Sequence, residues 1–166
     1  MATLHPIAPC LWFDDQAEDA AAFYISIFPN SRIVSVARYG EAGKETHGRP
    51  PGSVMVVEFE LNGQPFTALN GGPVFTFNEA VSFQLYCETQ EELDRYWEKL
   101  GAGGDPKAQV CGWLKDKFGL SWQVVPTGMK EMFAHGVTPG TERAMTALMQ
   151  MKKLDIAKLK RAYEGA

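Results

Sequence analysis

The residues best suited to chemistry in this sequence are neutral hydrogen-bonding side chains that alternate with apolar ones along short segments. Successive side chains of a β-strand point to opposite faces of a sheet, so the alternating residues would line one face. Hydroxyl and amide groups on a concave face bind small molecules through hydrogen bonds. The alternative is a filled interior whose polar groups satisfy one another. The candidate ligand-binding residues are Thr67, Ser82, Gln84, Tyr86 and Gln123.

Motifs for covalent or metal-assisted catalysis are absent from the sequence, which contains no nucleophile elbow, no CxxC and no HExxH. The three histidines are far apart in the chain. His5 precedes the first apolar segment, His47 lies in a stretch rich in Gly and Pro, and His135 lies near the tail. Each is expected to be solvated or to cap nearby backbone groups.

The three cysteines, Cys10, Cys87 and Cys111, are an odd number with wide spacing. This pattern indicates neither a disulfide framework nor a zinc site, and it predicts a cytoplasmic protein with reduced thiols. Cys87 and Cys111 are either reactive thiols or, as is commoner, buried small hydrophobes.

Four further residues leave two interpretations open. Asn70 would place an amide at a pocket mouth or satisfy the backbone of the following turn, and we favour the turn. Trp113 would stack on a flat ligand or pack in the core. Glu58 and Glu60 would form a carboxylate site if they faced inward, but charge facing water on an edge strand is the commoner arrangement.

Composition excludes several classes of partner. The 166 residues include 16 basic and 20 acidic ones, for a net charge of −4, which argues against nucleic acid or an anionic membrane as the partner. No apolar run reaches the roughly 20 residues of a membrane span, and the first residues lack the pattern of a signal peptide. The basic residues between 152 and 161 are expected to form the solvated face of a helix that docks by its apolar side.

Hydrophobic periodicity predicts a mixture of strands and helices. Asn62-Gly63 is the strongest hairpin dipeptide, Asp14 or Asp15 would cap the first helix, and Thr89 would cap the second. The predicted strands are 6–13, 32–39, 53–61, 64–70, 81–87, 109–115 and 120–125, and the predicted helices are 15–28 and 90–100.

An internal repeat organises these elements. The first strand and helix match the second set after a shift of 73 residues, and the hairpins match after a shift of 56, because the second copy lacks the 40–52 loop. The interpretation is one domain over 1–166, with βαβββ modules at 5–72 and 80–127 and a helical tail at 128–166. The matching pairs include Phe23 with Tyr96, Tyr24 with Trp97, Gly63 with Gly119 and Phe66 with Trp122.

Two such modules predict an α+β fold in which eight strands form one curved sheet, with a helix on the outer face of each module. In module two, Phe83 and Leu85 would pack under the helix and leave the polar set in the concavity. In module one, the shift of 73 places Pro9, Leu11 and Phe13 on the inner face with Thr67.

A set of short motifs spans nearly the whole chain up to Pro126. The motifs are Leu11-Trp12-Phe13, Ala22-Phe23-Tyr24, Ile27-Phe28, Ala68-Leu69-Asn70-Gly71-Gly72-Pro73, Phe77-Asn78-Glu79-Ala80, Cys87-Glu88-Thr89-Gln90-Glu91-Glu92, Cys111-Gly112-Trp113 and Lys115-Asp116-Lys117-Phe118-Gly119-Leu120-Ser121-Trp122. With these motifs the sequence resembles the vicinal-oxygen-chelate superfamily, which includes glyoxalase I, extradiol dioxygenases and bleomycin-resistance proteins. It resembles most the PhnB-like group, often described as 3-demethylubiquinone-9 3-methyltransferase. This resemblance implies the paired-module fold and a homodimer.

The resemblance also implies four metal-ligand positions, one on each inner strand. They fall on Pro9, Thr67, Ser82 and Gln123, of which only Gln123 offers a usable ligand. Because divalent metals require converging His, Cys or carboxylate groups, no metal and no other cofactor is expected.

A methyltransferase would need a Gly-rich turn between a first parallel strand and its helix. Here Gly101-Ala102-Gly103-Gly104 follows a helix instead and is typical of its C-terminal stop.

Three functions follow from these observations. The leading one is a metal-independent small-molecule binding protein or enzyme. The others are a metal-dependent lyase, isomerase or dioxygenase of the same superfamily and a dimeric interaction protein without a catalytic site. The methyltransferase is disfavoured because no methyl-donor motif is present.

Overall fold

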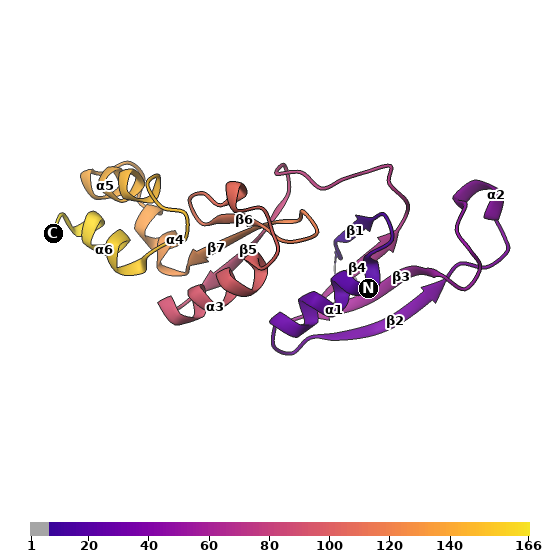
Figure 1. Ribbon diagram of the computed structural model, residues 1–166. Helices are drawn as coiled ribbons and strands as arrows, with labels where there is room; N and C mark the ends of the chain where they lie inside the picture. The colour runs from indigo at the N-terminus through magenta and orange to yellow at the C-terminus, as the bar shows by residue number, and fades with distance from the viewer. Residues whose placement is uncertain (1–6) are drawn as a thin grey trace, which may run out of the picture. The chain divides into compact units, whose positions relative to one another are not determined.

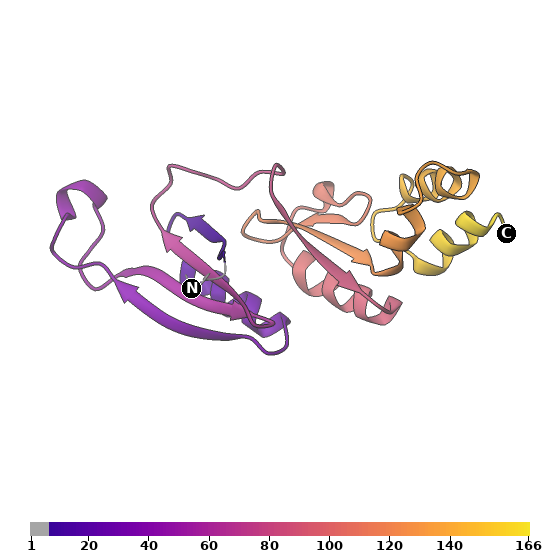
Figure 2. The same cartoon turned by 180° about the vertical axis from the view of Figure 1, so that it is seen from behind.

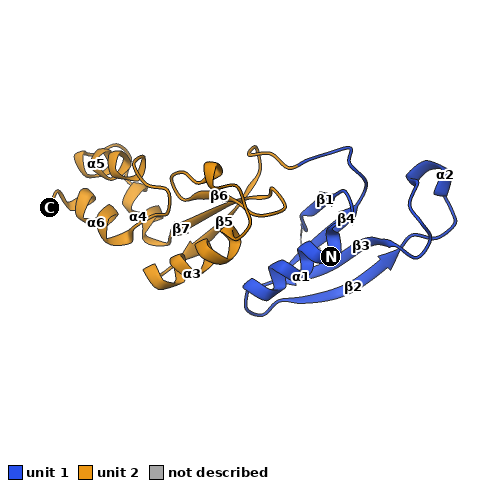
Figure 3. Ribbon diagram, in the orientation of Figure 1, with its two compact units in different colours: residues 1–76 blue, residues 77–166 orange. Residues whose placement is uncertain are grey.

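The chain divides into unit 1, residues 1–76, and unit 2, residues 77–166, in a computed structural model that describes residues 7–166 (Figure 3). The boundary falls between the two modules expected from the repeat. His5 lies outside the described residues. How the units associate, and hence the single-domain interpretation, stays a prediction.

Unit 1 is a βαβββ module, as expected. Its four strands form one mixed sheet in the order β1-β4-β3-β2, in which β1 and β4 are parallel and the other neighbours antiparallel (Figure 1). A single helical turn, α2, lies within the predicted 40–52 loop. The elements are β1 (Cys10–Phe13), α1 (Ala17–Ile27), β2 (Arg32–Arg38), α2 (Lys44–His47), β3 (Val54–Leu61) and β4 (Gln64–Asn70).

Helix α1 packs on one face of the unit 1 sheet (Figures 1 and 2). The Tyr24 ring stacks on Phe59, and Phe59 stacks on Phe66, with ring centroids 6.3 and 5.4 Å apart. Ala17 and Ala20 are fully buried, because small side chains allow the helix to approach the strands closely. This face is the core of unit 1.

Unit 2 has the three strands that periodicity predicted for it, one fewer than the βαβββ repeat implied. Its sheet, in the order β5-β7-β6, pairs β5 with β7 in parallel and β6 with β7 antiparallel. The structure therefore shows one sheet of four strands and one of three in residues 7–166, and not the eight-stranded curved sheet expected from the repeat. The elements are β5 (Ser82–Cys87), α3 (Gln90–Gly101), the 3₁₀ helix η1 (Pro106–Ala108), β6 (Trp113–Lys115), β7 (Ser121–Pro126), α4 (Gly128–Phe133), α5 (Pro139–Leu148) and α6 (Ile156–Glu164).

Two local features shorten the strands of unit 2. The helix η1 lies where unit 1 has β2, and Asp105 caps it through the Lys107 backbone N–H. The segment predicted as a strand from residue 109 instead turns at Cys111, whose φ of 51° is left-handed, and at Gly112. A left-handed residue cannot continue a ladder, so β6 begins only at Trp113.

The first strand of unit 1 faces the other way from the prediction. Leu11 and Phe13 are 6% and 3% exposed and lie on the helix face, whereas Cys10 pairs with Thr67 on the opposite face. The placement of Pro9, Leu11 and Phe13 on the inner face was therefore wrong. The cause is one residue fewer between β5 and α3 than between β1 and α1. The helices repeat at 73 residues but the strands at 74, and a one-residue slip moves every side chain to the other face.

Helix capping follows the prediction in unit 2 but not in unit 1. Thr89 Oγ1 accepts the Glu92 backbone N–H at 3.1 Å. At α1, neither Asp14 nor Asp15 caps the helix, whose N-cap is Gln16 without a side-chain bond.

The tail forms the helices α4, α5 and α6 of unit 2 and is bonded to the turn before β6. The Cys111 and Gly112 backbone N–H groups donate to the Met151 and Lys152 carbonyls at 2.8 Å each, and Leu154 is fully buried. No helix within residues 7–166 is long and apolar enough to cross a lipid bilayer.

Candidate functional site

Four of the five candidate residues form one hydrogen-bonded row on the face of the unit 2 sheet opposite α3. The Tyr86 hydroxyl donates to Gln84 Oε1 at 2.8 Å, and Gln84 Nε2 donates to Gln123 Oε1 at 3.3 Å. Gln123 Nε2 then donates to Ser82 Oγ at 2.8 Å. We call these four residues the polar row.

The polar row runs in one direction of donation, from Tyr86 to Ser82. Aligned hydrogen bonds polarise one another, so the two ends differ chemically. The Ser82 hydroxyl proton and the second amide protons of Gln84 and Gln123 are available to donate to a ligand, and the amide oxygens keep further lone pairs. The row can therefore bind both carbonyl and N–H groups.

Charge is placed only at the margins of the polar row. The Lys130 ammonium lies 4.2 Å from the centre of the Tyr86 ring, a cation–π contact at one end. At the other side of the sheet face, Lys115 pairs with Glu79. The hydrogen bond from Lys115 holds the pKa of the Glu79 carboxyl below its ordinary value. Neither charge lies within the row.

Thr67, the fifth candidate, lies in unit 1. It pairs with Cys10 and Glu58 on the face opposite α1. Because Thr67 and the polar row lie in different units, the part of Thr67 in ligand binding stays a prediction.

The cysteines and Glu58 have distinct environments. Burial raises the pKa of the Cys87 thiol to about 12, so this thiol is a structural hydrophobe. Cys10 is exposed, and Cys111 is half-buried. Glu58 is exposed and accepts a hydrogen bond from Ser35 at 2.8 Å. It lies on the face that carries Thr67, and β3 is an inner strand of its sheet, not the edge strand that was expected.

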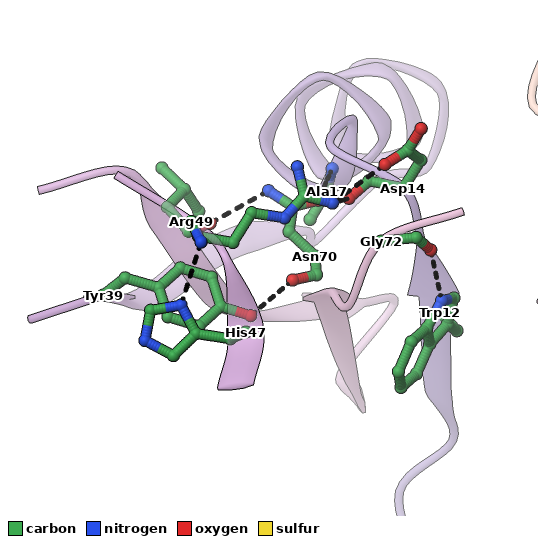
Figure 4. A network of polar contacts seen from close by, with 9 residues as sticks. Trp12, Asp14, Ala17, Tyr39, His47, Arg49, Asn70 and Gly72 are labelled. Carbon is green, nitrogen blue, oxygen red and sulfur yellow. Dashed lines mark hydrogen bonds and ion pairs between the residues drawn. The ribbon is translucent and has the colours of Figure 1, made fainter. Parts of the chain in front are cut away.

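Asn70 has a structural role, but its side-chain bonds go to other segments and not, as expected, to the following turn. Its Oδ1 accepts the Ala17 backbone N–H at 2.8 Å and its Nδ2 donates to the Val54 carbonyl at 3.1 Å (Figure 4). The Tyr39 hydroxyl donates to the Asn70 carbonyl at 2.6 Å. Asn70 therefore caps α1 from a strand 53 residues away, in place of a local aspartate.

The connection between β2 and β3 carries a cluster that sequence reasoning missed. The His47 ring stacks on Tyr39 with centroids 4.4 Å apart, and Nδ1 accepts the Arg49 backbone N–H at 3.0 Å. The Arg49 guanidinium reaches the Asp14 carboxylate at 2.8 Å (Figure 4). These residues are too far apart in the sequence to form a recognisable motif, so the sequence did not predict the cluster. Because they bond to one another, the cluster holds the β2–β3 connection in place and has a structural role.

Metal-ion chemistry does not fit the residues present. The hydroxyl of Ser82 and the amide of Gln123 already bond to each other, and hydroxyls and amides are weak ligands for a transition metal. Within residues 7–166, no group of three His, Cys, Asp or Glu side chains is placed to hold an ion. The chemistry of these side chains supports hydrogen bonding and not coordination.

Comparison with protein families identifies the chain. A family model described as 3-demethylubiquinone-9 3-methyltransferase matches residues 5–125. The chain belongs to this family. A PhnB protein from Bacillus cereus of the same description is 38% identical, with a TM-score of 0.62, and the match covers 74% of this chain and all of that one. The family resemblance is thus confirmed.

A more distant structure shares the fold. Protein PA1353 from Pseudomonas aeruginosa is 18% identical, with a TM-score of 0.56 over 74% of this chain and 98% of that one. The fosfomycin resistance protein FosX from Listeria monocytogenes is 16% identical, with a TM-score of 0.46 over 73% and 91%. Comparison with curated proteins found no match. The family match ends at residue 125, so α4, α5 and α6 lie beyond it.

Proposed function

We propose that the protein is a metal-independent small-molecule binding protein or enzyme of the glyoxalase-like superfamily, and that the polar row binds its ligand. The observation that carries this proposal is the unbroken donor–acceptor chain from Tyr86 to Ser82. Four neutral side chains from two adjacent strands converge on one sheet face, and the core lies on the other. A few well-placed polar groups of this kind fix the orientation of a small ligand.

The experiment is an NMR titration with a library of neutral hydrogen-bonding fragments, followed on the side-chain amide signals of Gln84 and Gln123. We expect binders to shift both signals, and Gln123→Leu to weaken their binding about fivefold, since one hydrogen bond contributes roughly 1 kcal/mol. Gln64→Leu, on an exposed glutamine of unit 1, is the matched control. Binders that shift only unit 1 signals would contradict the proposal.

Metal and methyl-donor chemistry are tested on the same protein. We expect the thermal unfolding midpoint to stay unchanged after dialysis against a chelator, and calorimetry with S-adenosylmethionine to show no heat of binding. Stoichiometric Zn, Ni, Mn or Fe in protein purified without chelator would favour the metal-dependent lyase, isomerase or dioxygenase. Tight S-adenosylmethionine binding would favour the methyltransferase of the family description.

The proposal includes a homodimer in the cytoplasm. Strand β2 is an edge of its sheet and is exposed along its whole length, including the apolar Ile33, Val34 and Val36. An exposed edge is a template for pairing with a second copy of the same strand. Light scattering after size-exclusion chromatography should give twice the 18.4 kDa chain mass, and Val34→Lys should return the protein to one copy.

A further inference from the structure

A cavity beside the polar row carries an inference about the kind of ligand, and this inference rests on the proposed function. The cavity has a volume of about 410 Å³ and lies on the β6 side of the unit 2 sheet. Its walls are mostly apolar and include Val110, Cys111 and Trp113. Pockets that hold small organic molecules begin at roughly 300 Å³, so there is room for one aromatic ring with a short substituent.

Ser121 is the one orphaned polar group of this region. The residue is 1% exposed, it lines the cavity, and its Oγ is the buried side-chain N or O atom that lacks a hydrogen-bond partner within residues 7–166. A buried hydroxyl without a partner destabilises a folded protein, because it loses its hydrogen bonds to water and gains none in return. Such a group is a natural anchor for a ligand atom that completes its hydrogen bonding.

The polar row ends beside this orphaned hydroxyl. Ser82 and Ser121 are directly opposite each other in the β5–β7 ladder, and Ser121 is opposite Lys115 in the β6–β7 ladder. Residues directly opposite in a ladder point to the same face. Ser121 lines the cavity, and the Ser82 hydroxyl at the end of the polar row therefore lies beside it on the neighbouring strand.

The charged side chains at the cavity disfavour ionised ligands. Among residues 7–166, the charged residues that line the cavity are Lys115 and Glu79, and they pair with each other. An anion would meet the Glu79 carboxylate and a cation the Lys115 ammonium, and either would have to lose hydration in an apolar space.

We propose that the site binds a neutral carbonyl compound with an aromatic or compact apolar body. Its oxygen accepts hydrogen bonds from Ser82 and Ser121, and its body fills the space beside Val110, Cys111 and Trp113. The remaining row, from Gln123 to Tyr86, binds the polar substituents.

Four probes test the proposal by NMR titration of the full chain: acetophenone, toluene, acetone and benzoate. Acetophenone combines ring and carbonyl, toluene lacks the oxygen, acetone lacks the ring, and benzoate adds a charge. We expect acetophenone to bind at least tenfold more tightly than each of the others and to shift the Trp113 indole signal. Equal binding of benzoate, or shifts confined to other residues, would overturn the proposal.

Ser121→Ala tests whether the Ser121 hydroxyl binds the ligand without contributing to the stability of the fold. We expect this variant to weaken acetophenone binding five- to tenfold, to leave toluene binding unchanged and to unfold at the same or a higher temperature, because it removes an unsatisfied hydroxyl. Ser35→Ala, at a surface serine of unit 1, is the control. Unchanged acetophenone binding in Ser121→Ala would reject the anchor.

Cysteine alkylation gives a second readout. Acetophenone should slow the reaction of Cys111 with iodoacetamide severalfold and leave that of Cys10, in unit 1, unchanged. If the fragments of the library bind at the polar row while Ser121→Ala and Cys111 protection show no effect, the carbonyl assignment fails and the proposed function stands. If Gln123→Leu also leaves the affinity of every binder unchanged, the carbonyl assignment and the proposed function both fail.

Discussion

The two modules of this chain solve the same packing problem with different parts. Unit 1 completes its sheet with a fourth strand, β2, and clamps the β2–β3 connection with His47 and Arg49. Unit 2 has the short helix η1 in place of that strand and is bonded to the tail through Cys111 and Gly112 instead. The comparison teaches that a module can fold without its fourth strand when a later segment of the chain supplies backbone hydrogen bonds and buries apolar side chains. The polar row lies in the module with the shorter sheet.

The largest expected effect concerns the tail. Leu154 is fully buried and lies against Gly112, so Leu154→Ala should destabilise unit 2 by about 2–5 kcal/mol. Amide hydrogen exchange should accelerate in β5 and β7 but not in β3 and β4. Met145→Ala, at a residue that is 44% exposed, should change neither. Equal acceleration in both units would show that they do not differ in their dependence on the tail.

Gly104 tests how η1 replaces a strand. A Cβ at this position would overlap the Lys115 carbonyl oxygen of β6, and a backbone atom cannot move aside as a flexible side chain can. We expect Gly104→Ala to destabilise unit 2 by about 1–3 kcal/mol in chemical denaturation. Gly128→Ala, where a Cβ would meet nothing within 4 Å, should be neutral. A neutral Gly104→Ala would mean that η1 is not held against β6.

Helix capping differs between the units and predicts a smaller contrast. Asn70 caps α1 across the fold with two buried hydrogen bonds, so Asn70→Ala should cost about 1–3 kcal/mol. Thr89 caps α3 locally, and Thr89→Ala should cost about 1 kcal/mol. Thermal unfolding of the two variants checks the order, and a larger loss for Thr89→Ala would reverse our assignment of the two caps.

The smallest effect is a pH dependence in the tail contact. Hydrogen bonds from Lys153 and Gln90 lower the pKa of the Asp94 carboxyl from its ordinary value of 3.8. Ionised Asp94 therefore stabilises the folded state above pH 3.8, and this contribution is lost as the pH falls through the lowered folded-state pKa.

The pH test compares the wild type with Asp94→Asn. The difference in their unfolding free energies should be constant near neutral pH and shrink in acid. It should be small throughout, because the pair is largely solvated. A difference that grows in acid would contradict the sign.

Local patterns predicted much of the fold. Alternation in 81–87 placed Ser82, Gln84 and Tyr86 on one face, and the structure joins them to Gln123 by hydrogen bonds. Thr89 was predicted as a cap because capping depends on residues three positions apart. Signals of this kind are short-range, so one sequence contains them in full.

Long-range features were not predictable in the same way. The one-residue difference between the two strand–helix connections placed Leu11 and Phe13 on the wrong face in the prediction. Hydrophobic periodicity within a segment does not show that a connection is one residue shorter. The cap on α1 comes from Asn70, and the orphaned hydroxyl of Ser121 is visible only once its neighbours are in place. These features depend on which strands pair, and the pattern of one segment does not contain that information.

The contact between Gly112 and Leu154 has a practical consequence. A Cβ on Gly112, whose φ is 84°, would lie 3.0 Å from Leu154 Cδ1, and Leu154 is fully buried. A larger residue at position 112 would therefore strain the backbone and press on the tail at the same time. The turn before β6 and the tail are thus not independent targets for protein engineering.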